Sequence, residues 1–206
     1  MRITLSTLAA SFLASTLALV AAAPQEGAAP AKASIGQPAP VFTLKGADGK
    51  TYNLADYKGK TVVLEWFCAT CPVSGNGDNS YWGSGRASKT IAAVTVADAS
   101  AVYLSIDSSK NGTPESSKAV VTTAGQSTPM LMDTDGKVGR AYGAKTTPHV
   151  FIVDGAGNVA YIGAPGSDDG KTDYIVNAVT ALKSGKPVEP ATTKNKGCGI
   201  KYASKG

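Results

Sequence analysis

The sequence has few side chains that bind metals, with one histidine and three cysteines among its 206 residues. A structural zinc site takes four ligands. A zinc site built on Cys68 and Cys71 would therefore need both Cys198 and His149, the only remaining candidates of these types. We accordingly expect no metal and no other cofactor.

Charged residues are also scarce, at 17% of the chain, and the net charge of +5 is unevenly placed. Arg2 carries one positive charge, and segment 186–206 has five lysines against one glutamate. Residues 24–185 hold 14 basic and 14 acidic side chains and are neutral overall. A neutral body offers no electrostatic attraction for nucleic acid. We expect segment 186–206 to be a basic, solvated tail that carries Cys198.

The first residues have the pattern of a secretory signal peptide. Arg2 precedes an apolar stretch over 3–20, and small residues follow at 21–23. A charged start, an apolar middle and a small-residue exit are typical of such a peptide. Several serines and threonines make the stretch weakly hydrophobic for the alternative, a membrane anchor. We predict a signal peptide over 1–23, a linker over 24–34, and a periplasmic or secreted protein without a membrane span after cleavage.

The hydrophobic pattern after the linker predicts alternating strands and helices. Strands are expected over 41–44, 51–54, 61–67, 101–107, 129–133, 149–154 and 159–164. Helices are expected over 86–97, from Pro114 with Thr113 as cap, over 137–142 and over 172–183. Four glycines and two asparagines in 72–85 indicate a helix that is short or broken.

This order predicts an α/β fold. The run Thr61–Phe67 is almost continuously apolar, as in a central strand covered on both faces. The Asp48-Gly49 turn between the first two strands predicts an N-terminal β-hairpin. Strands that alternate with helices and end in an antiparallel hairpin imply a central mixed sheet with helices on both faces.

Two cysteines follow the central strand at its carboxyl end, where active sites of open α/β sheets collect. In Cys68-Ala69-Thr70-Cys71, two intervening residues allow a disulfide if the second cysteine lies on a helical turn. A thiol at a helix N-terminus also has a lowered pKa, which favours the thiolate. The pair thus provides an attacking and a resolving sulfur. A zinc site and an inert structural disulfide are the alternatives.

Four segments resemble the redoxin branch of the alkyl hydroperoxide reductase/thiol-specific antioxidant family, in its exported bacterial form. They are Ile35–Phe42 (IGQPAPVF), Gly59–Phe67 (GKTVVLEWF) with Cys71-Pro72, Asp135–His149 (DGKVGRAYGAKTTPH) and Gly197–Lys201 (GCGIK). The resemblance covers 35–202 and implies a thioredoxin-like fold over 35–185. It also implies that Pro148 is a cis-proline beside the active-site sulfurs, and that Cys71 holds the position of the reactive cysteine.

The chain departs from the peroxiredoxin pattern Pro-x-x-x-Thr-x-x-Cys. Leu64 stands in place of the proline and Cys68 in place of the threonine, so the hydroxyl that activates peroxide is missing. The order of attack between Cys68 and Cys71 stays open. The resemblance also allows Cys198 to fold back and form Cys71–Cys198 instead of Cys68–Cys71, with a mobile free thiol as the alternative.

Other residues near the motif are candidates for the site. Glu65 lies where thioredoxins place a buried acid that moves protons. The alternatives are that it faces a solvated edge or pairs with a lysine. Burying a carboxylate is costly, so a buried Glu65 would suggest a task. His149 follows Pro148 and lies either near the sulfurs or exposed at a strand end. We predict that Trp66, Thr147 and His149 contact the substrate.

The predicted function is that of an exported thiol–disulfide oxidoreductase acting through a mixed disulfide. Its partners would be protein thiols and disulfides or a thioredoxin-like reductant. An odd number of cysteines in an exported chain agrees with this, because pairing leaves one thiol over. Two alternatives remain: reduction of peroxide at Cys71, and binding of copper by Cys68, Cys71 and His149 as soft ligands.

Overall fold

The computed structural model describes residues 32–204 of the chain, so the predicted signal peptide and most of the predicted linker lie outside the described residues. The strands are β1 (Thr43–Gly46), β2 (Thr51–Asn53), β3 (Val62–Phe67), β4 (Val102–Asp107), β5 (Met130–Met132), β6 (Thr146–Thr147), β7 (His149–Val153), β8 (Val159–Gly163) and β9 (Cys198–Gly199). The helices are α1 (Arg86–Ala97), α2 (Pro114–Thr123), α3 (Lys137–Tyr142) and α4 (Tyr174–Lys183), with a 3-10 turn over Leu54–Tyr57.

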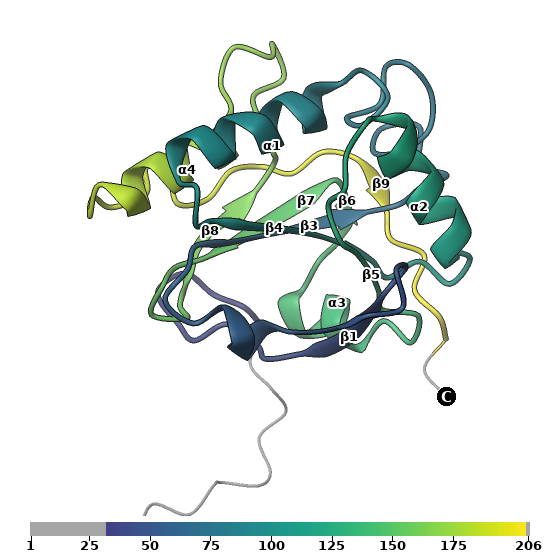
Figure 1. Cartoon of the computed structure of the whole chain (residues 1–206), viewed down its shortest axis with the longest axis horizontal. Helices are drawn as coiled ribbons and strands as arrows, with labels where there is room; N and C mark the ends of the chain where they lie inside the picture. The colour runs from purple at the N-terminus through teal and green to yellow at the C-terminus, as the bar shows by residue number, and fades with distance from the viewer. Residues whose placement is uncertain (1–31, 205–206) are drawn as a thin grey trace, which may run out of the picture.

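Seven strands form one mixed sheet in the order β2-β1-β5-β4-β3-β7-β8. Strand β4 is parallel to its neighbours β3 and β5, and the remaining pairs are antiparallel. Helices α1, α2 and α4 lie above the sheet and α3 lies below it, on the side to which β1 curls (Figure 1). The predicted α/β class, with a mixed sheet, helices on both faces and an N-terminal hairpin, is confirmed.

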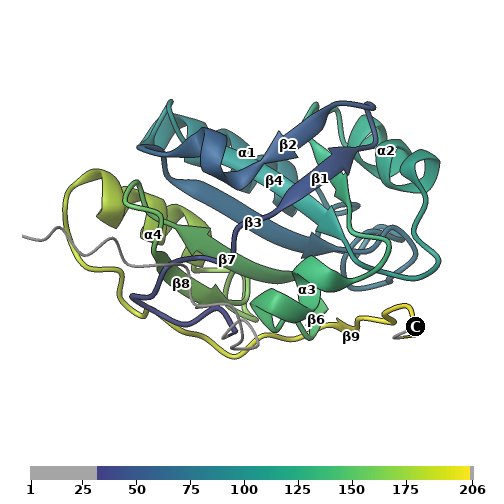
Figure 2. The ribbon, with the colours of Figure 1, turned by 90° about the horizontal axis from the view of Figure 1, so that it is seen from below.

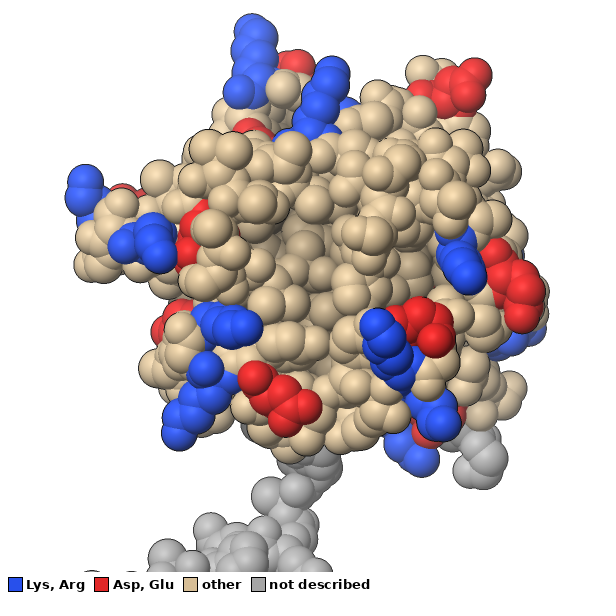
Figure 3. Space-filling view, viewed as in Figure 1, with Lys and Arg blue, Asp and Glu red and all other residues tan. Residues whose placement is uncertain are grey.

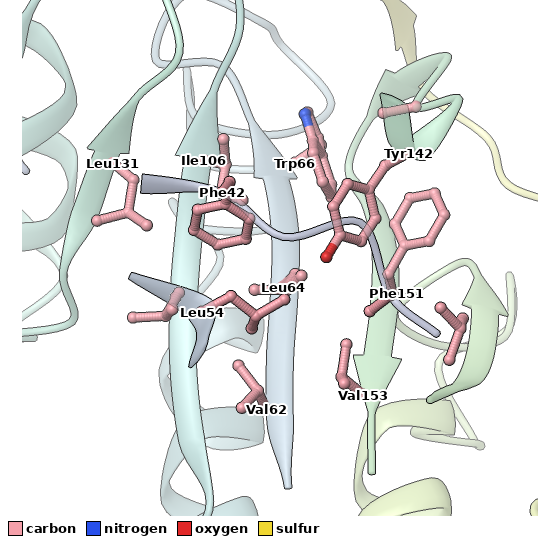
Figure 4. Close-up of a cluster of buried hydrophobic side chains, with 14 residues drawn as sticks. Phe42, Leu54, Val62, Leu64, Trp66, Ile106, Leu131, Tyr142, Phe151 and Val153 are labelled. Carbon is pink, nitrogen blue, oxygen red and sulfur yellow. The ribbon is translucent and has the colours of Figure 1, made fainter. Parts of the chain in front are cut away.

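Side chains of the central strand β3 alternate between the two faces, because successive residues of a strand point in opposite directions. Leu64 and Trp66 join a buried cluster with Tyr142 of α3 and Phe151 of β7 (Figure 4). The Trp66 ring centre lies 5.0 Å from that of Tyr142 and 5.1 Å from that of Phe151. This aromatic packing holds α3, and the chain that follows it, against the lower face of the sheet.

The opposite face of β3 carries Val63, Glu65 and Phe67. Val63 packs with residues of α1 and α4, while the Phe67 ring meets that of Trp82 at 5.9 Å between centres. Glu65 lies between these apolar neighbours, with 0% of its surface exposed. A charged side chain therefore sits in the middle of an otherwise apolar strand.

Most predicted elements are present. The helices predicted over 86–97 and 137–142 coincide with α1 and α3. Thr113 caps α2, where its hydroxyl oxygen accepts a hydrogen bond from the Ser116 N–H at 3.2 Å. A side-chain acceptor at this position satisfies an N–H group that has no partner within the helix.

The helix predicted over 72–85 is absent: this segment consists of turns and bends. Gly77 and Gly85 adopt φ angles of 88° and 75°. Such positive values are easy for glycine and costly for other residues. The glycines thus favour a turning path, and the first helix after β3 begins only at Arg86.

The described residues after α4, 184–204, lie on the surface but are bonded to the body, which corrects the prediction of a merely solvated tail over 186–206. This segment runs back along the β8 edge of the sheet and ends near α3 (Figure 2). The Ile162 N–H donates to the Ala191 carbonyl at 3.0 Å, and the Thr193 N–H donates to the Ile162 carbonyl at 3.1 Å. Its backbone therefore extends the edge of the sheet.

Charged side chains of both signs are scattered around the rim of the face shown in Figure 3, and its centre is uncharged. This distribution agrees with the neutral composition of the folded body. Between residues 32 and 204, no helix has the length and apolar character needed to cross a membrane.

Candidate active site

The structure joins Cys71 to Cys198 in a disulfide, although 127 positions separate them in the sequence. Their Cα atoms are 6.3 Å apart, which is within the usual range for such a bond. Cys68 is the free cysteine, and its side chain is partly exposed. Of the pairings left open by the sequence, the structure therefore contains Cys71–Cys198, and Cys198 is not a mobile thiol.

No helix begins at the cysteine pair, because α1 starts only at Arg86, so the predicted stabilisation of a thiolate by a helix N-terminus is wrong. In place of a helix N-terminus, one amide and one carbonyl group lie near the Cys71 sulfur. The Val73 N–H donates to the Cys71 Sγ at 3.4 Å, and the same sulfur lies 3.6 Å from the Thr147 carbonyl oxygen. A hydrogen bond from an amide favours the charged form of a sulfur once the disulfide opens.

The peptide bond between Thr147 and Pro148 is cis, as the resemblance implied. It places β6 beside the disulfide. Strand β6 pairs in antiparallel fashion with β9, with Thr147 opposite Cys198 and Thr146 opposite Gly199. Cys198 is thus held in place by the pairing of β9 with β6 as well as by its bond to Cys71.

All three cysteines line one pocket of about 180 Å³. The other lining residues are Thr70, Pro72, Ser109, Asn111, Thr147, Gly199, Ile200 and Lys201. Within the pocket, the Sγ of Cys68 and the hydroxyl oxygen of Thr70 are 3.4 Å apart. Cys71 has only 4% of its surface exposed, and its sulfur is bonded to Cys198. The pocket therefore contains a thiol, a disulfide and space for a further group.

Glu65 is buried, and the alternatives of a solvated edge or a lysine partner are wrong. Its carboxylate accepts hydrogen bonds from Trp82 Nε1 at 3.0 Å, Tyr103 OH at 3.0 Å and Ser105 Oγ at 3.3 Å. Burial raises the pKa of Glu65 from 4.5 to about 7, and the three donors limit that rise. The group therefore titrates near neutral pH.

The hydrogen bond to Trp82 connects Glu65 with the cysteine turn. The Trp82 N–H donates to the Ser74 carbonyl at 2.9 Å, and the Ser74 N–H donates to the Cys71 carbonyl at 3.2 Å. The Ser74 hydroxyl oxygen accepts from the Cys68 N–H at 3.4 Å. Glu65 thus anchors the loop that shapes both cysteines.

Trp66 and His149 do not line the sulfur pocket, so the prediction that they contact the substrate there is wrong. They are paired residues of β3 and β7 and share the lower face of the sheet, away from the cysteines. Trp66 is fully buried and donates from Nε1 to Ser108 Oγ at 3.0 Å. Thr147, in contrast, does line the pocket.

His149 is neither exposed nor beside the sulfurs. Only 4% of its surface is exposed, its ring centre lies 4.7 Å from that of Phe151, and its Nδ1 accepts the Lys145 N–H at 3.3 Å. Burial lowers the pKa of His149 to about 4. The copper set of Cys68, Cys71 and His149 is not brought together, and residues 32–204 contain no cluster of three or more metal-binding side chains of these types.

Sequence reasoning missed several residues of the site. Ser109, Asn111 and Lys201 line the pocket, and Ser74 supports the cysteine turn. Ser74, Ser109 and Asn111 belong to no motif with a recognisable spacing, whereas Lys201 ends the Gly197–Lys201 segment that carries part of the family resemblance. Gly197, directly before Cys198, was a further available signal, because a small residue allows two backbones to approach closely.

The family follows from the cysteine position, the cis-proline and the sheet together. Residues 35–162 match the AhpC/TSA family. This chain belongs to the AhpC/TSA family. It is a redoxin with a thioredoxin-like fold, and the family's chemistry is that of thiols. No curated protein matches this chain.

Solved structures similar to this redoxin support the fold. A hypothetical protein from Sinorhizobium meliloti 1021 has a TM-score of 0.72 at 24% identity, covering 84% of this chain and 96% of its own. An uncharacterized conserved protein from Geobacillus kaustophilus has a TM-score of 0.67 at 25% identity, covering 84% and 94%. DsbF of Mycobacterium tuberculosis, solved in mixed oxidised and reduced forms, has a TM-score of 0.53 at 22% identity, covering 68% and 94%.

Proposed function

We propose that this redoxin is an exported thiol–disulfide oxidoreductase in which Cys71 forms disulfides in turn with a substrate, with Cys68 and with Cys198. The observation that carries the proposal is one disulfide and one free thiol lining a single pocket. Neighbouring sulfurs of this kind exchange by attack of a thiolate on a disulfide. An inert structural disulfide would not need a third cysteine beside it.

The reaction begins with all three cysteines reduced. The Cys71 thiolate attacks one sulfur of a substrate disulfide, the substrate S–S bond breaks, and a mixed disulfide forms while the other substrate sulfur leaves as a thiolate. Cys68 then attacks Cys71, which releases the second substrate thiolate and forms Cys68–Cys71. The substrate gains two electrons, and the protein gains one disulfide.

In a final exchange Cys198 attacks Cys71, which frees Cys68 and gives the disulfide observed in the structure. The number of disulfides does not change in this step. The Val73 N–H stabilises the Cys71 thiolate each time it forms. A thioredoxin-like reductant would return the protein to its starting state by donating two electrons.

Reduction of a protein disulfide tests the proposal. The reduced mature chain should reduce the interchain disulfides of insulin, and Cys71→Ser should lower the rate to that of the uncatalysed reaction. Thr95→Ser, on the exposed face of α1, is the matched control and should leave the rate unchanged. Insulin reduction that survives in the double variant Cys68→Ser/Cys71→Ser would refute the proposal.

Peroxide reduction is a second candidate, favoured by the Cys71–Cys198 pairing itself. Attack of the Cys71 thiolate on a peroxide gives a sulfenic acid and releases an alcohol or water. Condensation with the Cys198 thiol then gives this disulfide and a second water. Stopped-flow mixing with hydrogen peroxide separates the two candidates. Because Cys68 replaces the activating threonine, we expect Cys71 to react no faster than an ordinary thiol.

Export is part of the proposal and rests on the pattern of residues 1–23. The expected mature chain begins after small residues such as Ala22 or Ala23. Intact-mass measurement of the protein recovered from a periplasmic or culture fraction tests this. Recovery of the uncleaved chain in the cytoplasm would contradict it.

A further inference from the structure

The last part of the chain, residues 194–203, forms a strap across the sulfur pocket. Its backbone is extended and bonded at several points to other elements. The Ile200 N–H donates to the Lys145 carbonyl at 3.0 Å, and the Lys110 N–H donates to the Lys201 carbonyl at 2.8 Å. Together with the pairing of β9 and β6, these bonds give the strap the form of a peptide bound along an edge.

Gly197, the strap residue before Cys198, lies very close to the cis-proline segment. A Cβ atom at this position would approach the carbonyl oxygen of Thr147, and would lie 2.7 Å from the Thr147 carbonyl carbon and 3.2 Å from Pro148 N. These are backbone atoms that cannot move aside easily. A Cβ at Gly199, two residues further on, would meet nothing within 4 Å. Only the position before the cysteine is sterically restricted.

The outer end of the strap is anchored by Tyr202. Its hydroxyl donates to the Ala144 carbonyl at 2.8 Å, and the Arg140 guanidinium lies 4.7 Å from the ring centre. A Cβ at Gly139 in α3 would lie 2.6 Å from the Tyr202 hydroxyl oxygen, so the ring packs against bare helix backbone. Tyr202 does not line the sulfur pocket, so this anchor can be altered separately from the sulfurs.

We propose that the strap occupies the place of the substrate, and that the substrate is an extended protein segment with a glycine immediately before its reactive cysteine. This inference rests on the proposed function. A partner segment pairs with β6 as β9 does and bonds its cysteine sulfur to Cys71. Addition of a strand to an exposed edge is a common way to bind peptides, in which backbone bonds supply affinity and side-chain space supplies selectivity.

Cys68 makes the site available. Its thiolate attacks Cys71, the Cys68–Cys71 bond forms, the Cys71–Cys198 bond breaks, and Cys198 leaves as a thiolate that takes a proton from water. No oxidant or reductant is consumed, because one disulfide replaces another. The strap is then held only by its backbone bonds and Tyr202, and it leaves β6 free. In the next step, a thioredoxin-like reductant opens Cys68–Cys71 by donating two electrons. The Cys71 thiolate then attacks the disulfide of the partner segment, which forms the mixed disulfide with the partner's cysteine and releases the other partner sulfur as a thiolate.

Three peptides test the steric requirement on the full mature chain. In the double variant Cys68→Ser/Cys198→Ser, Cys71 is the only thiol, and adding Tyr202→Ala loosens the strap. Each peptide carries its cysteine as a pyridyl disulfide, so attack by Cys71 forms the mixed disulfide and releases pyridine-2-thione, whose absorbance gives the rate. The sequences are KNKGCGIKYA, KNKACGIKYA and the matched control KNKGCAIKYA.

We expect the first and third peptides to react at similar rates and the second about tenfold more slowly, since one steric clash costs on the order of a lost hydrogen bond or more. Tyr202→Ala should raise the rates of the first and third. The same order should hold with Tyr202 intact, so the test does not depend on that variant folding. In 8 M urea all three peptides should react alike.

Equal rates for the three peptides with the folded protein would overturn the inference. Insulin reduction that persists alongside equal rates would leave the proposed function standing. A folded protein whose Cys71 reacts with no peptide and reduces no insulin would overturn the proposed function as well.

Discussion

Glu65 shows how one residue can link stability to the site. It is the single ionisable side chain of the central strand, and the chain surrounds it with three donors rather than with a cation. A buried carboxylate without a positive partner is held mainly in its protonated form until the pH approaches its raised pKa. Through Trp82, the same side chain supports the cysteine turn.

The raised pKa of Glu65, about 7 against 4.5, predicts a dependence of stability on pH. Between these values the folded state binds more protons than the unfolded state, so the free energy of unfolding falls as pH rises through this window. The full effect would be about 3 kcal/mol. Glu65→Gln lacks this titration, so its stability relative to the natural chain should rise by that order between pH 4 and pH 8, as measured by urea unfolding. The prediction would be contradicted if the free energies of unfolding of the two proteins changed in parallel between pH 4 and pH 8.

At the scale of elements, two short strands decide which sulfurs meet. Strands β6 and β9 contribute two residues each, yet their pairing places Cys198 opposite Thr147. Pairs so short gain little from backbone bonds alone. Their register depends on the close approach of Gly197 to the cis-proline segment.

Gly197→Ala should therefore slow closure of the Cys71–Cys198 disulfide, because the added methyl group would push β9 from β6. Gly199→Ala introduces the same group into open space and is the matched control. After oxidation of the reduced chain, peptide mapping by mass spectrometry should show less Cys71–Cys198 and more Cys68–Cys71 in the first variant than in the second. Similar amounts of the Cys71–Cys198 disulfide in the two variants would show that the close approach of Gly197 to the cis-proline segment does not limit formation of this disulfide.

The N-terminal cap of α2 offers a test of an element away from the sulfurs. The Thr113 hydroxyl accepts from the Ser116 N–H, and the Ser116 side chain accepts from the Thr113 N–H at 3.2 Å. Thr113→Ala should lower the free energy of unfolding by about 1 kcal/mol. Thr122→Ala, exposed near the end of the same helix, should change it far less. Denaturant unfolding of the two variants gives the comparison.

At the scale of the whole molecule, the disulfide ties the end of the chain to the centre of the sheet. It closes a loop of 127 residues. A cross-link over such a distance restricts the unfolded chain strongly, whereas Cys68–Cys71 would restrict only a few residues. The two disulfide pairings should therefore stabilise the folded protein to different extents, in addition to their different roles in the reaction.

Cys198→Ser should accordingly lower the free energy of unfolding of the oxidised protein by about 2–5 kcal/mol. Cys68→Ser keeps the long-range disulfide and should be close to the natural chain. Under reducing conditions the difference between the two variants should largely disappear. An oxidised Cys198→Ser protein as stable as Cys68→Ser would mean that the bond contributes nothing to the fold.

Much of the fold could be predicted because its signals are local. The apolar run of β3, the Asp48-Gly49 turn and the Thr113 cap each express a preference of neighbouring residues. The Cys68-Ala69-Thr70-Cys71 motif and Pro148 were likewise visible in short stretches of sequence. The glycines of 72–85 predicted a short or broken helix, and the structure has turns and bends there, with positive φ angles at Gly77 and Gly85.

The sequence by itself determined the strand and helix order, the family and the cysteines available for chemistry. Only the tertiary structure decided that Cys198 reaches Cys71, that Glu65 is buried among donors, and that Trp66 and His149 face away from the sulfurs. Local preferences act over a few residues, whereas these outcomes depend on contacts between segments far apart in the chain. Such contacts are fixed only when the whole core packs.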